Sequence, residues 1–434
     1  MSTFHTEAST EIATAAMAPV WTSLLPKKVA LAIRVIEEWN QINKVGTNAS
    51  EEVGAHPTLS LWAPFLHSWP EEVQGLPENI PYEDLEREAQ CATFVSDTRS
   101  YCSWLEEQYH IITITNAQSN ALFSWEMFRK AMQLVGSRSI QLSSSRSILV
   151  PILDMANHDA EPTARYRLVE VTQSLPNNSD HQDESSTVES KQFIQLVANR
   201  NLDAGEDITI SYGKQYSNRQ MAGLYGFVPI SNPHDYELVS LLEILQAAID
   251  GGALLPPDNM SYKDVKELLF TSIEQVAMLG VPTTNLRLSR SQLDLDLWLA
   301  LRIALTNWNS YAQSNYDEDT FSNLAYILEA IEMDEADEDD LWESDTNVDA
   351  TRRAKIFYTA LGILEQKIGG SSTNAEEDEQ ILHNNDTNNV KECYQILIQL
   401  RLERKNLIRS VARNMQLVLE QPERALEVVA DLIH

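Results

Sequence analysis

The apolar positions of the first 140 residues recur every three or four places, which is the spacing of a buried helical face. This pattern predicts helices near 26–40, 82–92, 96–110 and 124–136. Pro26 suits the first turn of the first helix, and Ser124 can cap the last one. We expect a loop over 41–55. An aromatic cluster interrupted by prolines follows it, formed by Leu61, Trp62, Ala63, Pro64, Phe65, Leu66, Trp69 and Pro70.

Between residues 148 and 212 the helical spacing gives way to short apolar runs. Residues 148–153 form an apolar run that ends in a turn, and 192–197 and 207–212 are typical of strands. In the last of these, Ile208 and Ile210 share one face. The polar, acidic stretch 176–190 has no periodicity and predicts a solvated loop.

From residue 235 onward helical periodicity returns and glycines thin out. Helices are expected over 238–249, 263–278 and 293–312, with a long, regular last helix. The stripe of that last helix consists of Ile396, Leu400, Leu407, Val411 and Met415. The acidic stretches 334–345 and 371–389 are expected to be loops. The sequence thus predicts an α+β chain that divides near residue 232 into a mixed domain, 1–232, and an all-α domain, 233–434.

Composition and charge narrow the range of partners. The net charge of −32 over 434 residues argues against nucleic acid and favours attraction of basic protein segments. No apolar run is long enough to cross a bilayer, and residues 1–20 do not read as a secretory signal. Three cysteines without metal-ligand spacing predict no metal site and a reduced intracellular compartment.

The chemistry-bearing residues concentrate between 150 and 228. The chain contains no Cys-x-x-Cys, His-Glu-x-x-His, Gly-x-Ser-x-Gly or Gly-x-Gly. Asn157-His158 follows the apolar run, and Tyr212-Gly213 ends a predicted strand. Each of these features also has a purely local interpretation. Asn157-His158 is then a turn, Ser217-Asn218 a helix N-cap and Gly226 a helix stop.

The order of these motifs is more specific than any one of them. Asp-x-x-Asn-His at 154–158, Ala-Gly-Glu at 204–206, Ile-x-Ile-Ser-Tyr-Gly at 208–213, Ser-Asn at 217–218 and Tyr-Gly-Phe-Val at 225–228 follow one another along the chain. This series resembles the C-terminal half of a SET domain, and more narrowly the two-domain class typified by Rubisco large-subunit methyltransferase. The resemblance implies a β-rich SET domain with a helical insertion over about 26–135. It also implies that the helical domain, whose last helix carries Arg401, Arg404, Lys405 and Arg409, binds the substrate.

The resemblance also implies a role for individual residues. The activity would be methyl transfer from S-adenosylmethionine to a lysine, or a histidine, of a non-histone protein. Tyr212 would be the tyrosine at the methyl-transfer centre. The cofactor would contact Asn157, His158, Arg138, Ser137 and Phe227. The substrate would contact Asp154, Tyr225 and Tyr166.

One part of the family pattern has no counterpart in this sequence. SET domains open with a hairpin that bears a Gly-x-Gly loop, and the first family feature here is already the stretch 26–40 within the insertion. Two interpretations follow. The sequence is a piece of a longer methyltransferase, or it is a degenerate SET protein that serves as an acidic, non-catalytic binding module. A cytoplasmic or nuclear location suits both, and a chloroplast location suits a longer protein.

Overall fold

The computed structural model describes most of the chain. The described residues are 3–4, 26–47, 59–70, 73, 75–115, 124–143, 146–174, 188–213, 216–256, 260–290, 292–312, 346–368, 373–384 and 392–433. The expected loop over 334–345, and most of those expected over 41–55 and 176–190, lie outside these residues.

The chain groups into two compact units. The first, here the N-terminal unit, holds Met1–Asn79, Ser96–Lys214 and Gly223–Gly226. The second, here the C-terminal unit, holds Ile80–Val95, Gln215–Ala222 and Phe227–His434. The domain boundary predicted near residue 232 stays a prediction.

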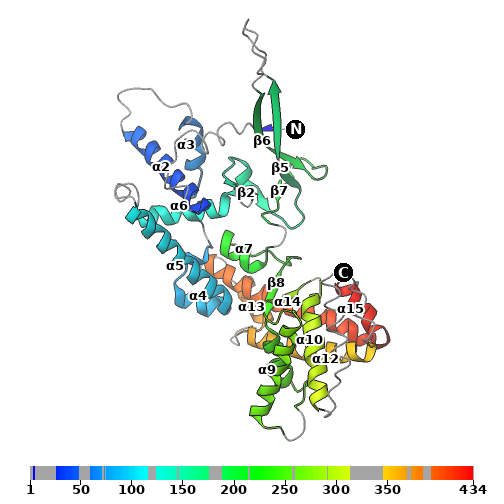
Figure 1. The fold of residues 1–434 in the computed structure, drawn as a ribbon. Helices are drawn as coiled ribbons and strands as arrows, with labels where there is room; N and C mark the ends of the chain where they lie inside the picture. The colour runs from blue at the N-terminus through cyan, green and yellow to red at the C-terminus, as the bar shows by residue number, and fades with distance from the viewer. Residues whose placement is uncertain are drawn as a thin grey trace. The chain divides into compact units, whose positions relative to one another are not determined.

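Helices of the N-terminal unit pack through an aromatic core. They are α2 (Lys27–Thr47), α3 (Leu59–His67), α5 (Ala92–Thr115, which begins in the C-terminal unit) and α6 (Trp125–Arg138) (Figure 1). The predicted aromatic cluster is buried, with Phe65 between Trp62 and Trp69 at ring-centroid distances of 5.4 and 5.1 Å. The expected N-cap at Ser124 is confirmed, because its side chain accepts from the backbone of Met127. The loop expected from residue 41 is wrong over its first part, since α2 continues to Thr47 and Ile42 still packs against the core.

The strands of the N-terminal unit form small sheets. Strand β5 (Ala164–Ser174) pairs antiparallel with β6 (Val188–Ala198) over its whole length, and β1 (Thr3–Phe4) lies on the other edge of β6. Strands β2 (Ile140–Ser143) and β3 (Arg146–Ile148) form an antiparallel pair. The short strands β4 (Asn157–His158) and β7 (Thr209–Ile210) pair in parallel. A buried cluster of Ile140, Ile148, Val150, Leu153, Ala164, Ile194 and Ile210 joins these strands.

Two expectations about the strands need correction, and a third is confirmed. Strand β5 was not expected, and residues 188–190 belong to β6 rather than to the predicted loop. The apolar run over 148–153 ends in a turn as expected, with Ile148 at the end of β3 and a 3-10 helix following at Leu153–Met155. The positive φ of Ile152, 73°, makes that turn possible.

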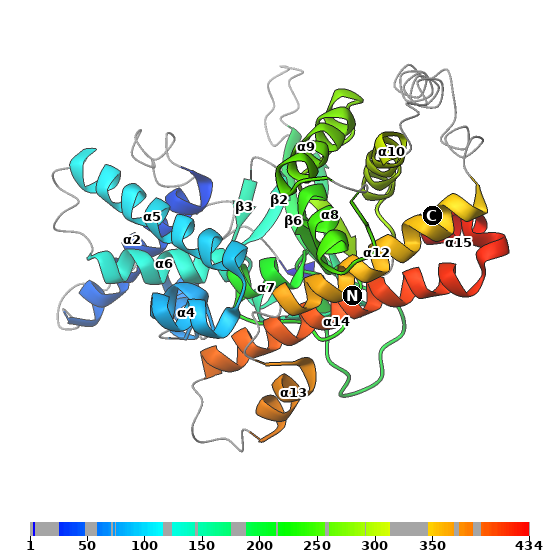
Figure 2. The same cartoon turned by 90° about the horizontal axis from the view of Figure 1, so that it is seen from below.

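The C-terminal unit is largely helical. It contains α4 (Tyr82–Ala89), α8 (Leu241–Asp250), α9 (Tyr262–Met278), α10 (Leu295–Ala312), α12 (Asn347–Ile368), α13 (Ala375–Asn384), α14 (Glu392–Glu420) and α15 (Ala425–Ile433). Helix α7 (Asn218–Tyr225) begins in this unit and ends in the other. Helices α12 and α14 run side by side in both views (Figures 1 and 2). The predicted α+β class is confirmed. The unit also holds a two-stranded sheet, β8 (Tyr236–Val239) with β9 (Leu286–Ser289), which periodicity did not indicate.

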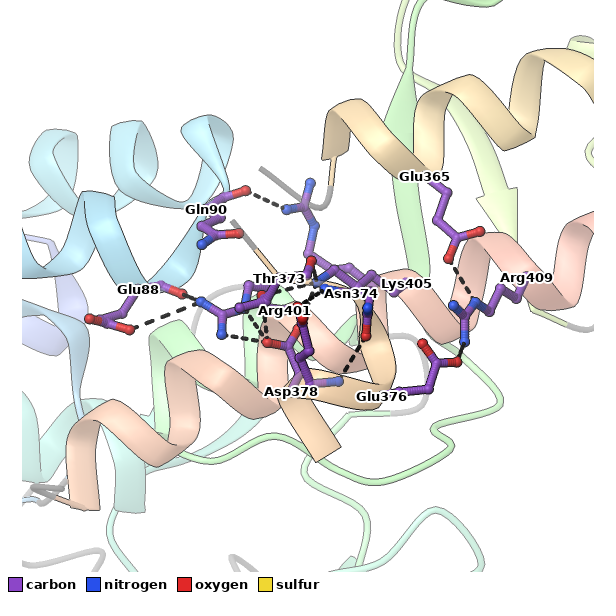
Figure 3. Close-up of polar contacts among 12 residues, drawn as sticks. Glu88, Gln90, Glu365, Thr373, Asn374, Glu376, Asp378, Arg401, Lys405 and Arg409 are labelled. Atoms are coloured by element: carbon purple, nitrogen blue, oxygen red, sulfur yellow. Dashed lines mark hydrogen bonds and ion pairs between the residues drawn. The ribbon is translucent and has the colours of Figure 1, made fainter. Parts of the chain in front are cut away.

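The long helix α14 has both an apolar stripe and a buried basic face. The predicted stripe is confirmed, since Leu400, Leu407 and Met415 are fully buried. On the basic face, Arg401 and Lys405 both contact the carboxylate of Asp378 (Figure 3). Asp378 lies in α13, so the loop predicted over 371–389 is wrong there. Its acidic residues are not simply solvated, because some of them pair with α14.

Among the described residues, no helix combines the length and apolarity needed to cross a bilayer.

Candidate functional site

Two short parallel strands fix the centre of the candidate site. In this pair Asn157 lies opposite Thr209, and His158 lies opposite Ile210. Two reciprocal bonds secure β7. The Thr209 amide donates to Oγ1 of Thr163 (2.8 Å), and the Thr163 amide donates to Oγ1 of Thr209 (3.1 Å). The Asn157-His158 pair and strand β7, about fifty residues apart in the sequence, are therefore held in one register.

Tyr212 is anchored at both ends. Its backbone amide donates to Nδ1 of His158 (3.1 Å), and its phenol donates to the carbonyl oxygen of Ala156 (2.9 Å). Because Nδ1 accepts, the neutral imidazole carries its proton on Nε2. The Tyr212 ring lies 5.4 Å from the His158 ring and 4.7 Å from the Tyr225 ring, centroid to centroid. The structure thus brings three predicted site residues together.

An ion pair lies near this tyrosine. Nη1 of Arg138 is 2.8 Å from Oδ2 of Asp154, whose side chain is fully buried. The guanidinium of Arg138 also lies 6.0 Å from the ring centroid of Trp69. Burial raises the pKa of Asp154, and the hydrogen bond from Arg138 offsets part of that rise. The other carboxylate oxygen, Oδ1, is buried as well, and the Trp69 side chain also lowers the pKa of this carboxylate by hydrogen bonding.

Burial also raises the pKa of Tyr212. The positive charge of Arg138 lowers this pKa and the negative charge of Asp154 raises it, so both groups are electrostatic neighbours of the phenol. The phenol therefore keeps its proton at neutral pH. A protonated hydroxyl can orient a bound group but is a poor general base.

The remaining predicted site residues have different environments. The side chain of Asn157 is exposed and makes no hydrogen bond to described residues, so its amide is open to a ligand. The hydroxyl of Ser137 donates to the carbonyl of Gln133 (2.8 Å), within its own helix. Tyr166 is partly buried beside Leu196, its partner across the strand pair. Phe227 belongs to the C-terminal unit, and its predicted contact with the cofactor stays a prediction.

The Ser-Asn motif has a structural role in the C-terminal unit. Ser217 caps α7, since the Gln220 amide donates to its Oγ (3.3 Å) and Oε1 of Gln220 accepts from the Ser217 amide (3.0 Å). Asn218 is buried and donates its side-chain amide to the carbonyl of Pro229 (3.1 Å). Its backbone amide donates to Oδ1 of Asp235 (2.8 Å). The local interpretation of this motif is therefore confirmed.

Sequence reasoning missed the contributions of Ala156, Thr163 and Trp69. Ala156 acts through its carbonyl, which no side-chain pattern can reveal. Thr163 is 46 residues from Thr209, and no local signal links them. Trp69 had been assigned only to the aromatic cluster. No group of residues that could hold a metal ion occurs in the described part of the chain.

The fold, a small set of short sheets carrying Asn157-His158 and Tyr212 and a large helical part, is similar to that of solved LSMT structures. A solved structure of the SET domain of LSMT bound to lysine and AdoHcy superposes with a TM-score of 0.56 at 15% identity, covering 96% of this chain and 81% of that one. Rubisco LSMT bound to AdoMet gives 0.52 at 15% identity, covering 95% of this chain and 82% of that one. Rubisco LSMT bound to sinefungin and monomethyllysine gives 0.54 at 15% identity, covering 96% and 80%. At this identity the likeness establishes the fold, and it confirms the predicted resemblance at that level.

Similarity in sequence is more limited. SET domain-containing protein 8 of Schizosaccharomyces pombe is 21% identical over an alignment of 225 residues, and the match covers 49% of this chain. The match spans 45% of that protein, which is less than half of its length. No protein-family model matches the chain.

Proposed function

We propose that this chain transfers a methyl group from S-adenosylmethionine to a lysine side chain of a protein. The observation that carries the proposal is the anchoring of Tyr212, whose amide is bonded to His158 and whose phenol is bonded to the Ala156 carbonyl. The LSMT structures of the same fold are bound to lysine and AdoHcy, to AdoMet, or to sinefungin and monomethyllysine, which supports S-adenosylmethionine and a lysine as ligands here.

Asn157 and His158 suit the cofactor. S-adenosylmethionine supplies an electrophilic methyl group on a sulfonium. The exposed amide of Asn157 offers both a donor and an acceptor, as an adenine edge requires. The adjacent His158 is held in one tautomer by the Tyr212 amide. These residues would hold the adenine end, while the sequence offers no Gly-x-Gly for the methionine end.

Tyr212, Tyr225 and Asp154 suit a substrate amine. A lysine must lose its proton before its nitrogen can attack, and a partly dry aromatic site favours the neutral amine. The rings of Tyr212 and Tyr225, 4.7 Å apart, supply such a surface. Asp154 would lie on the substrate side, and its buried carboxylate, paired with Arg138, would act by holding Arg138 in place rather than by bonding the amine directly. Positioning supplies most of the rate enhancement, and no strong base is needed.

The kind of substrate and the compartment are proposed from the sequence as well. The net charge of −32 favours a substrate segment that is basic, and a non-histone protein fits the class that the chain resembles. Histidine is a second methyl acceptor that the resemblance leaves open. Cys91 and Cys102 are free thiols, which supports a reduced intracellular compartment.

Calorimetry and mass spectrometry test this proposal. S-adenosylmethionine should bind the wild-type chain, and candidate protein substrates should gain the mass of a methyl group. Tyr212→Phe should lower the transfer rate about a hundredfold while cofactor binding persists. Tyr358→Phe, at an exposed tyrosine of α12, is the matched control and should transfer at the wild-type rate. A wild-type chain that binds no cofactor would refute the proposal.

A second candidate is a protein-binding module that does not methylate. The observation that favours it is the absence of any Gly-x-Gly among the fourteen glycines. A module of this kind would capture a basic partner equally well with and without S-adenosylmethionine, and Tyr212→Phe would leave the capture unchanged.

A further inference from the structure

A cavity of about 570 Å³ lies within the C-terminal unit, and its size is that of a ligand pocket. Strand β8 contributes three successive residues to its wall, Glu237, Leu238 and Val239. Successive side chains of a strand point to opposite faces. A cavity lined by three residues in a row must therefore lie along the edge of the strand, where backbone N–H and C=O groups are presented.

That edge of β8 has no strand partner in the described part of the chain. The sheet consists of β8 and β9, paired from Tyr236 with Ser289 to Val239 with Leu286. Exposed strand edges are templates for an added strand. The edge is short, four residues, so it can pair with only a few residues of a partner.

The floor of the cavity is apolar. Val239, Leu269 and Leu364 are each at least 95% buried. Two apolar side chains at the mouth remain exposed, Phe270 at 54% and Leu242 at 38%. Such an arrangement suits one bulky apolar side chain, which would lie on the floor between Phe270 and Leu242.

Two of the four charged residues that line the cavity neutralise each other, and the other two, Glu243 and Lys266, are opposite in sign. Arg404 makes a two-bond pair with the Glu237 carboxylate, at 2.9 and 3.1 Å, and donates a third bond to the carbonyl of Gln90 (3.1 Å). Both members of this pair are buried, so neither is a free charge for an ionic ligand. Outside the cavity, the net charge of −32 attracts basic groups. The lining therefore carries no net charge and complements an apolar residue, while the net charge of the whole chain favours basic neighbours beside that residue.

We propose that this cavity binds an extended segment of a protein partner, which adds to the edge of β8 and places a bulky apolar side chain on the floor. The proposal names the docking site for the substrate of the proposed methyl transfer, and in that sense it rests on the proposed function. The segment carries lysine or arginine beside its apolar anchor.

A peptide-binding assay without cofactor tests this site separately from methyl transfer. The probes are fluorescein-labelled, acetylated hexapeptides with flanking lysines and one scanned central position, and the readout is fluorescence anisotropy with the full chain. Peptides with central Leu, Ile, Phe or Trp should bind at least about tenfold tighter than those with Gly or Asp. Hydrogen exchange of residues 236–239 should slow when such a peptide binds.

Substitutions at the mouth complete the test. Phe270→Asp should remove the preference for apolar centres, and Leu242→Asp is a second variant at an exposed position. Val348→Asp is the control, since Val348 is an exposed apolar residue of α12 that does not line the cavity. Equal affinity for all centres, or equal loss in the control, would overturn the proposal. So would binding that depends only on the lysines and disappears at moderate salt. None of these outcomes bears on the Tyr212 experiment, because no methyl donor is present.

Discussion

The substitution Asp378→Asn is expected to release helix α13 from helix α14. The Asp378 carboxylate is fully buried and is the shared acceptor of two cations. Nε of Arg401 donates to it at 3.0 Å, Nζ of Lys405 at 2.7 Å and Oγ1 of Thr373 at 2.7 Å (Figure 3). Asparagine keeps the shape and one acceptor oxygen but removes the charge.

The magnitude follows from the burial of the two cations. The side chains of Arg401 and Lys405 are only 4% and 3% exposed, so without Asp378 both charges stay away from water. Breaking one buried ion pair costs about 3–5 kcal/mol. Part of the cost is offset, because Arg401 also donates to the Glu88 carbonyl and Lys405 to the Thr373 carbonyl. We expect a loss of about 3–5 kcal/mol, since a second cation is stranded at the same time.

Hydrogen exchange with peptide-resolved mass spectrometry measures this loss directly. Opening of α13 should become roughly 10² to 10⁴ times more frequent, the factor that corresponds to about 3–5 kcal/mol. Glu379→Gln removes a neighbouring exposed charge from the same helix and should change the opening free energy by less than about 0.5 kcal/mol. Similar exchange in the two variants would refute the reasoning.

A compensating variant separates the charge from the packing. Replacing the whole cluster, with Asp378→Leu, Arg401→Met and Lys405→Met together, leaves no buried charge in the cluster. Helix α13 should then regain most of its protection from hydrogen exchange.

The pH dependence of the Asp378 interaction has a defined sign as well. Burial raises the pKa of Asp378, but the bonds from Arg401, Lys405 and Thr373 outweigh it, so the folded pKa is lowered. The stabilisation is therefore present above the unfolded pKa and is lost as the pH falls through the folded value.

Three further predictions concern single side chains. Burial raises the pKa of Asp235 to about 7, so ionisation of this carboxyl lowers the free energy of unfolding as the pH rises from about 4 to about 7. Asp235→Asn should therefore stabilise the chain at pH 8 by at most about 4 kcal/mol and have little effect at pH 4. Urea titrations at both pH values measure the difference. Asn157→Ala should weaken S-adenosylmethionine binding about fivefold by calorimetry, while the melting temperature stays unchanged because the side chain is exposed. Ser240→Ala removes the capping box with Glu243 and should cost about 1 kcal/mol, seen as faster exchange in the first turn of α8.

Helices were predictable from the sequence where one face is continuously buried. The stripe through Leu400, Leu407 and Met415 follows helical spacing because every member meets the core. The N-cap at Ser124 is equally local, since donor and acceptor are three residues apart. In both cases the information that determines the structure lies within the segment itself.

Elements whose stability comes from distant partners were not predictable in this way. Over residues 164–170, strand β5 carries mostly partly exposed or exposed side chains. Its order depends on pairing with β6, in register from Ala164 with Ala198 to Ser174 with Val188. Helix α13 was taken as solvated because its sequence is acidic. Its Asp378 is buried by cations 23 and 27 residues further along the chain, a relation that no local pattern contains.

The two asparagines of the candidate motifs illustrate what a motif can and cannot specify. Asn157 and Asn218 both belong to the series that resembles a SET domain, and sequence alone could not separate ligand contact from local structure for either. Asn218 is 1% exposed, and its side chain is bonded to the carbonyl of Pro229 and to the side chain of Asn232, so its hydrogen-bonding capacity is used in folding. Asn157 is exposed, and its side chain makes no hydrogen bond to described residues. Its backbone is nevertheless ordered in strand β4, which costs conformational entropy as it does for Asn218 in its helix. A side chain that is held in place by its backbone but does not contribute to the fold is the one to test for ligand binding, and this is why Asn157, rather than Asn218, is the substitution chosen for the calorimetric experiment.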